Sequence, residues 1–593
     1  MLDDRSHRRT FGVFYTPAHL ADLMAELSIP RCERDRVAIL DPACGDGALL
    51  AAALKNQMGA TSESNRLDLI RDRLFGVDVD PLAVAQTRRR LFDSISPRAC
   101  DADELRQRLD AQIVCGNALT GADFSDAKRI APRDDEPSPD IDWKNAFPQI
   151  ARRGGFDLVI ANPPYRRERN SKPMFDRLAE SPLGKRWRTP RMDLWHYFFH
   201  RGLDLLQPDG RLCFLVNSYW TKSPGARPLI ERMHHETAIE EIVEFDTLPL
   251  FEEVGGRHLI LQLQKSAAAK KRCRLTRMKS LDDQLTAQHS TWLAPSEMFH
   301  GGQLILQSQI PLEHAMSDRL GERFLVRQGI AENPPTINAK LTREFPDLYR
   351  IGDGVFVLTA DEVASLEMND DERPLLRPYA QPLELQRYHL PTEPKRFLLY
   401  LTPRTAPDLS RFPHIERHLQ RFRPLLERRR EVQKGSISWW HLHWPREERL
   451  FTQPRILHVQ MGRRPTFVYA EEPLFVGFSV NIVAENFTRE NDRQLRLPDH
   501  GDLPLPVLTA ILNSASAADW FAAFAKRRGV NLEISGTVLR RFPLPQCEPE
   551  TTTRLNELSV RYHAELSGRS ADEEHADIER DINALVADLY GAR

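Results

Sequence analysis

The stretch VAILDPACGDGALLAAAL, residues 37–54, contains the pattern from which the fold can be predicted. A short apolar run typical of a buried strand is followed by Asp41, a turn with two glycines and an apolar helical segment. Gly45 and Gly47 allow the turn to approach a ligand closely. A dinucleotide-binding loop would have a third glycine where Leu50 stands, so a ligand without a pyrophosphate is favoured. An ordinary strand–turn–helix corner is the alternative.

Outward from this corner, β-rich runs alternate with helical patterns. This alternation predicts an α/β fold: a doubly wound, mostly parallel sheet covered by helices on both faces. The predicted strands are VAIL (37–40), LFGV (74–77), QIVCG (112–116), FDLVIA (156–161) and RLCFLV (211–216), and the predicted helices begin at Ala48, Pro81 and Leu194.

Polar residues follow the second and third predicted strands. An acid at the position of Asp78 commonly accepts hydrogen bonds from ribose hydroxyls in doubly wound sheets. Asp80, before Pro81, is expected to be the N-cap of the next helix. Asp78 could also be a cap, but one cap suffices for one helix. Asn117 ends the third strand with both a donor and an acceptor.

The strongest motif is FDLVIANPPYRRER, residues 156–169, in which a buried strand leads to Asn162, Pro163, Pro164 and Tyr165. The two prolines stiffen the loop and donate no N–H, so their carbonyls can act as acceptors. The Asn162 oxygen and the Pro163 carbonyl could each accept one hydrogen of an exocyclic amino group as its nitrogen becomes tetrahedral. Tyr165 offers a flat face for stacking a heterocycle. A rigid structural turn ending in a packed tyrosine is the alternative.

On these motifs the chain resembles the N6-adenine DNA methyltransferases of the gamma, TaqI-like arrangement, found in type II and type IIG restriction–modification systems. GVFYTP (12–17) is similar to the family's opening motif, DPACGDG (41–47) to its cofactor loop and NPPY (162–165) to its catalytic motif. The resemblance implies a Rossmann-like methyltransferase fold, S-adenosylmethionine as cofactor, and methylation of adenine N6 in double-stranded DNA. It implies catalytic roles for Asn162, Pro163 and Tyr165, and cofactor contacts from Tyr15, Thr16, Pro17, Asp41, Ala43, Gly45, Gly47, Asp78 and Asn117.

Two further positions belong to this resemblance. The family usually has Asp where Asn117 stands, contacting the cofactor's adenine amino group, and Asn can still accept there through its carbonyl. Phe251, within TLPLFEEVGGRHLILQLQK (247–265), falls on the family's second base-stacking aromatic. An ordinary core phenylalanine is the alternative for Phe251. The target adenine is expected to flip out of the duplex and lie against Tyr165.

The pattern changes near residue 270, where KSAAAKKRCR follows an apolar strand. We therefore expect a methyltransferase domain over 1–270, a connector over 271–299, an α+β target-recognition domain over 300–546 and a C-terminal helical segment over 547–593. The motifs that resemble the family's recognition half are VRQGIAENPPTI (326–337), WWHLHWPR (439–446), ILNS (511–514) and RRFPLPQ (540–546).

The charge balance requires local basic surfaces. The chain has 82 Lys plus Arg and 84 Asp plus Glu, a net charge of −2, so DNA must meet locally concentrated positive charge. Residues 411–435 contain seven Arg and one Lys against three Glu. Arg428, Arg429 and Arg430 are the expected phosphate contacts, and a solvated helix face is the alternative.

Other classes are disfavoured. No run of about 18 apolar residues and no secretory leader is present, and the seven cysteines lack CxxC spacing, so we expect a cytoplasmic protein without a metal site. No nuclease motif is found, so a partner endonuclease or defence-system subunit would be separately encoded. RNA and protein-glutamine methyltransferases also carry NPPY but generally lack a long recognition half. Cytosine-N4 enzymes more often have Ser where Asn162 stands.

Overall fold

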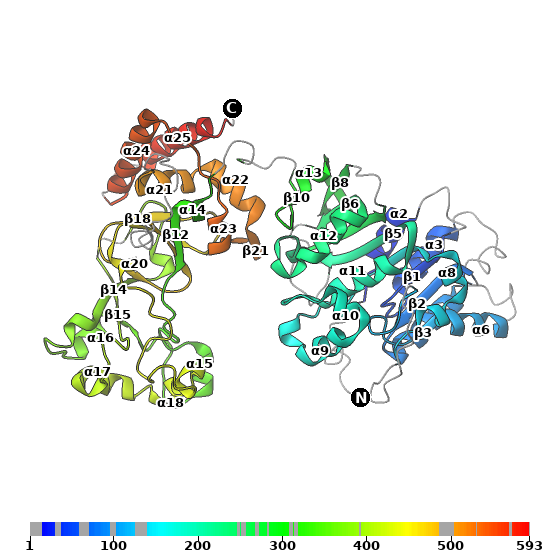
Figure 1. Ribbon diagram of the computed structural model, residues 1–593, viewed down its shortest axis with the longest axis horizontal. Helices are drawn as coiled ribbons and strands as arrows, with labels where there is room; N and C mark the ends of the chain where they lie inside the picture. The colour runs from blue at the N-terminus through cyan, green and yellow to red at the C-terminus, as the bar shows by residue number, and fades with distance from the viewer. Residues whose placement is uncertain are drawn as a thin grey trace, which may run out of the picture. The chain divides into compact units, whose positions relative to one another are not determined.

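The structure is a computed structural model of the chain. It describes residues 15–29, 37–58, 70, 72–94, 102–124, 139–245, 250, 257–266, 272–281, 284–307, 312, 318–390, 393–485, 503–528, 530–567 and 572–591. The chain divides into two compact units, Met1–Gln309 and Ile310–Arg593, each with its own core (Figure 1).

The first unit is built on a nine-stranded sheet with the order β3-β2-β1-β4-β5-β7-β6-β8-β9. The strands β1 to β5 pair in parallel, and β7 is antiparallel to both β5 and β6. The strand order reverses between β1 and β4, which makes the carboxyl ends of these strands the expected ligand crevice. The bounds are β1 (Ile39–Asp41), β2 (Leu74–Asp78), β3 (Ile113–Cys115), β4 (Phe156–Ala161), β5 (Leu206–Asn217), β6 (Thr237–Phe245), β7 (His258–Lys265), β8 (Cys273–Leu281) and β9 (Gln284–Leu293).

Helices cover both faces of this sheet, so the predicted α/β fold is confirmed. Successive residues of β4 point to opposite faces: Leu158 and Ile160 join one core cluster, while Val159 and Ala161 join the other. The helices of the first face are α2 (Ala18–Ser28), α3 (Ala48–Met58), α5 (Pro81–Asp93) and α6 (Ala102–Gln112). Those of the second are α7 (Trp143–Ala146), α8 (Pro148–Arg153), α9 (Lys172–Glu180), α10 (Pro182–Trp187), α11 (Leu194–Leu205), α12 (Arg227–Glu236) and α13 (Pro295–Met298).

The predicted helix starts at Ala48, Pro81 and Leu194 are those of α3, α5 and α11. Asp80 is the N-cap of α5, as predicted: its side chain accepts a hydrogen bond from the Leu82 N–H.

The predicted boundary at residue 270 and the connector over 271–299 are wrong. β8 pairs in parallel with β6 and antiparallel with β9, so both strands extend the sheet of the first unit, which runs to Gln309. In β8, Cys273, Leu275 and Met278 are buried whereas Arg274, Arg277 and Lys279 are exposed, and the alternation shifts by one residue at the buried Thr276. This period-two alternation is typical of a strand with one solvated face, and the neighbouring lysines and arginines concealed it.

The second unit is α+β, as expected, with three small sheets of order β12-β20-β16-β18, β13-β15-β14-β19 and β17-β22-β21. Its strands are β12 (Phe324–Gln328), β13 (Val357–Thr359), β14 (Leu376–Ala380), β15 (Arg396–Leu399), β16 (Arg455–Val459), β17 (Met461–Gly462), β18 (Phe467–Ala470), β19 (Phe475–Val476), β20 (Val480–Glu485), β21 (Lys526–Arg528) and β22 (Asn531–Glu533). Its main helices are α14 (Leu320–Arg323), α15 (Ala339–Glu344), α16 (Ala360–Ser365), α17 (Pro413–Gln420), α18 (Arg423–Leu426), α19 (Arg430–Gln433), α20 (Arg449–Thr452), α21 (Leu505–Asn513), α22 (Ala515–Phe524) and α23 (Gly536–Arg540).

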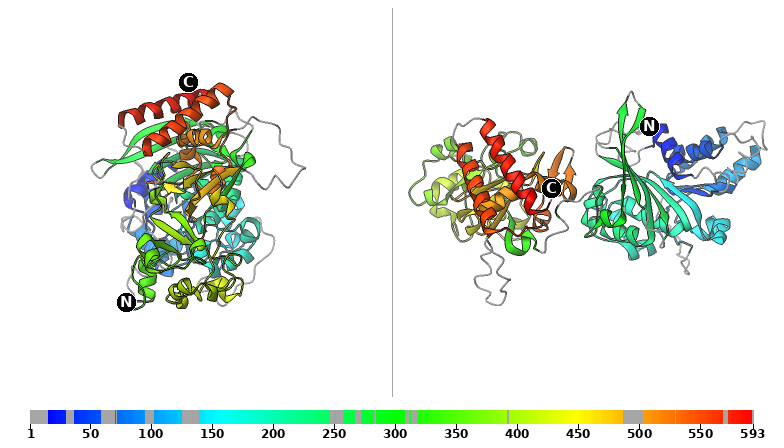
Figure 2. Two further views of the ribbon diagram at one scale, coloured as in Figure 1. Left: turned by 90° about the vertical axis from the view of Figure 1, so that its left-hand side faces the viewer. Right: turned by 90° about the horizontal axis from the view of Figure 1, so that it is seen from above.

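The C-terminal segment forms two helices, α24 (Pro549–Ser567) and α25 (Asp572–Leu589), which lie side by side (Figure 2). They are part of the second unit rather than a separate segment. Glu579 pairs with Arg387 at 2.6 Å, and the Asn583 side chain accepts from the Ala515 N–H at 2.8 Å.

Within the described ranges, no single helix has both the length and the apolar composition needed to cross a membrane. The bent pair α21 and α22 meets that test only jointly, by length and composition. Over the same ranges, no group of three or more His, Cys, Asp or Glu side chains converges as a metal site would require.

Candidate active site

The loop after β1 is held tightly by its neighbours. Gly45 and Gly47 have φ of +55° and +79°, in the left-handed region that favours glycine. A Cβ on Gly45 would lie 3.4 Å from the Tyr15 ring, and one on Gly47 would lie 3.0 Å from Thr87 in α5. The loop is therefore packed between Tyr15, before α2, and Thr87 of α5. The left-handed φ of both glycines also disfavours larger residues there.

Asp78, the last residue of β2, braces this loop. Its Oδ2 accepts a hydrogen bond from the Gly45 N–H and its Oδ1 accepts from the Asp80 N–H, both at 2.9 Å. Burial raises the pKa of the Asp78 carboxyl. A carboxylate has lone pairs beyond these two bonds, so contact with a ribose hydroxyl stays a prediction.

Asp41 is buried, with only 1% of the residue exposed, whereas Asp78 is partly exposed. Its Oδ1 accepts from the Ala43 N–H at 3.0 Å. Burial raises the pKa of Asp41 to about 8; the hydrogen bond from Ala43 opposes this shift, and the charges of Asp78 and Asp46 add to it. Two neighbouring carboxyls with raised pKa values make this edge of the sheet favourable for a cation.

Asn117 lies at the carboxyl end of β3, beside Asp78: the Gly116 N–H donates to the Asp78 carbonyl at 2.8 Å. Its side-chain Oδ1 accepts from the Leu119 N–H at 3.0 Å. The oxygen predicted to contact a cofactor thus already has one partner in its own turn. The cofactor contact stays a prediction for the second lone pair.

The amide of Asn162, directly after β4, is held on both sides. Its Nδ2 donates to Thr16 Oγ1 at 3.2 Å, and the Tyr165 hydroxyl lies 3.0 Å from Asn162 Oδ1, to which it donates. The same hydroxyl lies 2.9 Å from the Leu215 carbonyl of β5, a second acceptor. Burial, with a smaller effect of the Asp193 charge, raises the pKa of Tyr165 well above its usual value, which keeps the phenol a donor. The structure therefore brings the segment before α2 and the catalytic motif together.

Sequence reasoning missed Asp193, which lies just before α11. Its Oδ1 accepts from the Arg166 N–H at 3.1 Å and so fixes the backbone after Tyr165. Burial raises the pKa of Asp193 to about 7, and the charge of Arg167 opposes the shift. The only sequence signal was an acid before a helix, which is indistinguishable from an ordinary cap.

The structure describes two of the remaining predicted site residues. Pro17 is the N-cap of α2, and Pro163 is buried. Phe251 lies outside the described residues.

The prediction that Arg429 contacts phosphates is wrong. Its side chain is 7% exposed, and its guanidinium donates to the carbonyls of Leu426, Trp439 and His441 at 2.6 to 3.1 Å. Burial lowers the pKa of Arg429 to about 10. This arginine organises the loop that carries the tryptophans. Arg428, whose guanidinium lies 4.5 Å from the centre of the Phe345 ring, and Arg430 are exposed, so their DNA contacts stay predictions.

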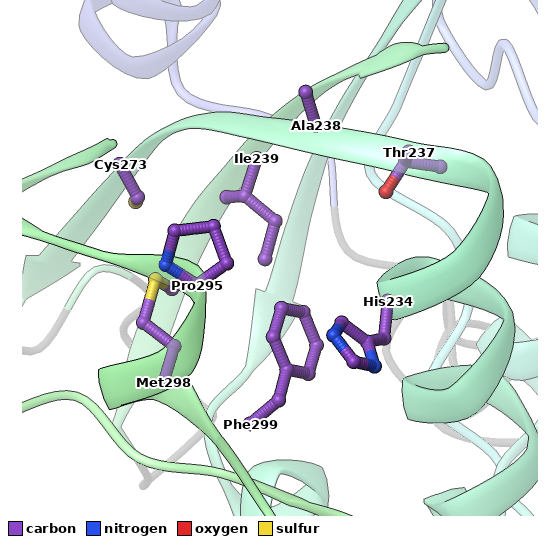
Figure 3. A pocket seen from close by; sticks show the side chains of 8 residues that line it. All are labelled: His234, Thr237, Ala238, Ile239, Cys273, Pro295, Met298 and Phe299. Carbon is purple, nitrogen blue, oxygen red and sulfur yellow. The ribbon is translucent and has the colours of Figure 1, made fainter. Parts of the chain in front are cut away.

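Two cavities lie in the described part of the first unit. An open cleft of about 450 Å³ borders the loop at Tyr15 and Asp46. A second cavity, of about 10 Å³, has room for roughly one water molecule. It lies among apolar residues of α12, β6 and the β8–α13 region, with the rings of His234 and Phe299 stacked at 4.5 Å (Figure 3). Neither is lined by Asn162.

Two families of known proteins match the first unit. Residues 5–92 match the family described as N-6 DNA Methylase, and residues 72–251 match the Eco57I restriction-modification methylase family. The matches cover the loop after β1, Asp78 and the NPPY motif. The first unit is thus a DNA methyltransferase domain. More narrowly, this unit is similar to the N6-adenine-type DNA methyltransferases of type II restriction–modification systems.

Relatives with this domain align over most of the chain. The type II methyltransferase M.XhoI of Xanthomonas vasicola is 22% identical over 73% of this chain and 77% of its own length. M.BanIII of Aneurinibacillus aneurinilyticus is 22% identical over 78% of each. Among solved structures, the type IIL enzyme MmeI in complex with DNA matches with a TM-score of 0.62 at 12% identity, over 100% of this chain and 78% of that chain. At that identity the structural match shows the fold alone.

Proposed function

We propose that this chain transfers a methyl group from S-adenosylmethionine to the N6 amino group of adenine at a specific site in double-stranded DNA. The order of motifs along the chain supports the gamma, TaqI-like arrangement: the cofactor segments at 12–17 and 41–47 precede NPPY at 162–165, and the second unit follows. The observation that carries the proposal is the Asn162 amide, fixed between Thr16 and Tyr165 beside a loop that is held by the acids Asp41 and Asp78.

The residues around the loop fit the proposed cofactor. S-adenosylmethionine carries a sulfonium cation, ribose hydroxyls and no phosphate, and when bound it supplies an activated methyl group. Asp41 provides a buried carboxyl and Asp78 a partly exposed one, for a cation and for hydroxyls. Gly45 provides a loop surface without a side chain, and the Tyr15 ring lies against it. Thr16, Pro17, Gly47 and Asn117 complete the proposed set.

The NPPY loop supplies the chemistry of the amine. As the adenine nitrogen becomes nucleophilic, its two hydrogens need acceptors, which we assign to the Asn162 side-chain oxygen and the Pro163 carbonyl. Thr16 holds the NH₂ end of the amide, so the oxygen end is the one left to accept. The Tyr165 hydroxyl fixes the same oxygen from the other side. The amide is thereby oriented before substrate arrives, and little reorganisation accompanies the reaction.

An amino group inside a duplex cannot reach this loop, so the target adenine must leave the stack. Tyr165 is the proposed stacking surface, and its hydroxyl, whose single hydrogen is shared between Asn162 Oδ1 and the Leu215 carbonyl, fixes the ring. Phe251 is the proposed second aromatic contact.

The second unit is proposed to select the DNA sequence. The methylation would protect DNA against a separately encoded restriction endonuclease or defence-system subunits. With DNA as the substrate, the cytoplasm is the proposed place of action.

The test combines sequencing with one substitution. DNA from cells expressing the wild-type chain, read by modification-sensitive long-read sequencing, should show N6-methyladenine in one recurrent sequence. Asn162→Ala should reduce methyl transfer by on the order of a hundredfold while cofactor affinity changes little. Asn145→Ala, at an exposed position in α7, is the matched control and should behave as wild type. N4-methylcytosine, or unmodified DNA with methylated RNA or protein, would contradict the proposal.

A further inference from the structure

Three arginines of the second unit gather at the carboxyl end of β12. Arg327 of β12 and Arg540 of α23 both donate to the Val326 carbonyl, at 3.2 and 2.6 Å. Arg446 donates through Nε to the Gly329 carbonyl at 3.1 Å, just beyond the end of the same strand. β12 and α23 are in contact (Figure 1). Residues from three distant parts of the chain therefore place their guanidinium groups at one end of one strand.

The positive charge of this cluster is not compensated locally. Burial lowers the pKa values of Arg446 and Arg540, and the charge of Arg327 lowers both further. None of the three arginines forms an ion pair with any described residue, whereas Arg377 and Arg396 of the same unit are paired with Glu448 and Glu384 at 2.7 and 2.8 Å. Like charges held together without an acid repel one another, and a bound anion would relieve that repulsion.

Exposed aromatic and amide groups surround the arginines. The Trp444 side chain is 55% exposed, and the Arg446 guanidinium lies 5.4 Å from the centre of its ring. Phe478 is also 55% exposed, and its carbonyl accepts from the side chains of Gln328 and Gln460. We define the β12 surface as Arg327, Gln328, Trp444, Arg446, Gln460, Phe478 and Arg540.

The predicted basic stretch at 411–435 has a different character. There Arg429 is buried and donates hydrogen bonds to three carbonyls. Arg423 is paired with Glu427 at 2.7 Å. Arg421 lies 3.8 Å from Asp353. Three of its eight basic side chains are therefore engaged within the protein, two of them with acids, whereas no arginine of the β12 surface is paired with a described acid.

We propose that the β12 surface is where the second unit binds double-stranded DNA, with Arg327, Arg446 and Arg540 contacting backbone phosphates. This inference rests on the proposed function and adds the location of the phosphate contacts. Amide side chains beside phosphate-binding arginines are suited to base edges, because Gln can pair with the donor and acceptor of adenine in the major groove. Gln328, which is exposed, is therefore the residue placed to contact a base, whereas Gln460 already donates its amide group to the Phe478 carbonyl and to Asn481.

The experiment measures binding of the full chain to a 30-base-pair duplex labelled with a fluorophore, across a titration from 50 to 200 mM salt. Arg327→Gln with Arg446→Gln removes two charges from the β12 surface. The matched control, Arg343→Gln with Arg404→Gln, removes two charges from exposed positions of the second unit outside the β12 surface. We expect the β12 double variant to flatten the slope of log affinity against log salt by up to about 1.8, at about 0.9 per phosphate contact. The control should keep the wild-type slope.

Folding is monitored separately, since Arg446 also supports a main-chain carbonyl. Arg327→Glu alone changes an exposed side chain whose acceptor, the Val326 carbonyl, keeps its bond from Arg540, so it should weaken binding by at least the effect of Arg327→Gln, with an unchanged unfolding midpoint. An unaltered slope in the β12 variants, or an equal change in the control, would overturn the inference. So would equal competition by an RNA duplex of the same sequence. If the wild type neither binds DNA nor methylates it, the proposed function fails as well; if it methylates DNA normally, only the location is wrong.

Discussion

The buried acid at the end of β1 makes the proposed cofactor site sensitive to pH. With a pKa of about 8, Asp41 is mostly protonated at pH 6 and about half ionised at pH 8. A sulfonium cation favours the ionised carboxylate, so affinity for S-adenosylmethionine should rise with pH. The ionised fraction grows from about 1% to about 50% over this range, which allows an increase of up to about fiftyfold if only the ionised form binds.

Titration calorimetry at pH 6, 7 and 8 measures this dependence, with Asp41→Asn as the control. The titration of the ligand's own groups is common to both proteins, so the ratio of their affinities isolates Asp41. At pH 7 the wild type should release close to one proton per cofactor bound, seen by comparing buffers of different ionisation enthalpy. If wild type and Asp41→Asn show the same pH dependence, the argument from burial is refuted.

The other predictions concern contacts around the site and in the second unit. Tyr165→Phe keeps the ring but loses the hydroxyl that fixes Asn162, so kcat should fall about five- to tenfold, equivalent to about 1 kcal/mol, with the fluorescence increase of a 2-aminopurine at the target position retained. A lost fluorescence increase would show that the hydroxyl matters for stacking instead. Thr16→Val removes the acceptor of the Asn162 NH₂ group and should lower kcat more than it raises the KM for cofactor; the opposite split in steady-state kinetics would make Thr16 solely a cofactor contact. Arg429→Met should lower the free energy of unfolding by on the order of 3 kcal/mol in a denaturant titration, since three carbonyls lose their donor, whereas Arg428→Met should change it little. Equal effects would contradict the structural role of Arg429.

The catalytic half could be predicted from the sequence because its signals are local. Each parallel strand is a short apolar run, and the polar residue after it is placed at the carboxyl edge by the topology of the sheet. Asp41, Asp78, Asn117 and Asn162 were found in this way. The contacts between these residues were not, because Thr16 and Asn162 are 146 positions apart and nothing in either segment encodes their pairing.

The errors have a common physical origin: composition does not report burial. Composition near residue 270 predicts a connector over 271–299, although β8 and β9 within that range extend the sheet. The arginines at 428–430 were treated as one surface, although Arg429 lies in the interior. The uncompensated cluster of Arg327, Arg446 and Arg540 left no local signal, because its members are dispersed over more than two hundred positions.

The short segment before α2 links the loop after β1 to the NPPY motif. Tyr15 rests on Gly45, while its neighbour Thr16 holds Asn162. A ligand that displaces Tyr15 from the loop would therefore also disturb the hydrogen bond on the Asn162 amide. Binding of the methyl donor at the loop and the orientation of the Asn162 amide are thus linked through two adjacent residues, Tyr15 and Thr16, rather than through the sheet. Because such coupling is reciprocal, the methyl donor and the nucleic acid would each change the affinity of the other by the same factor.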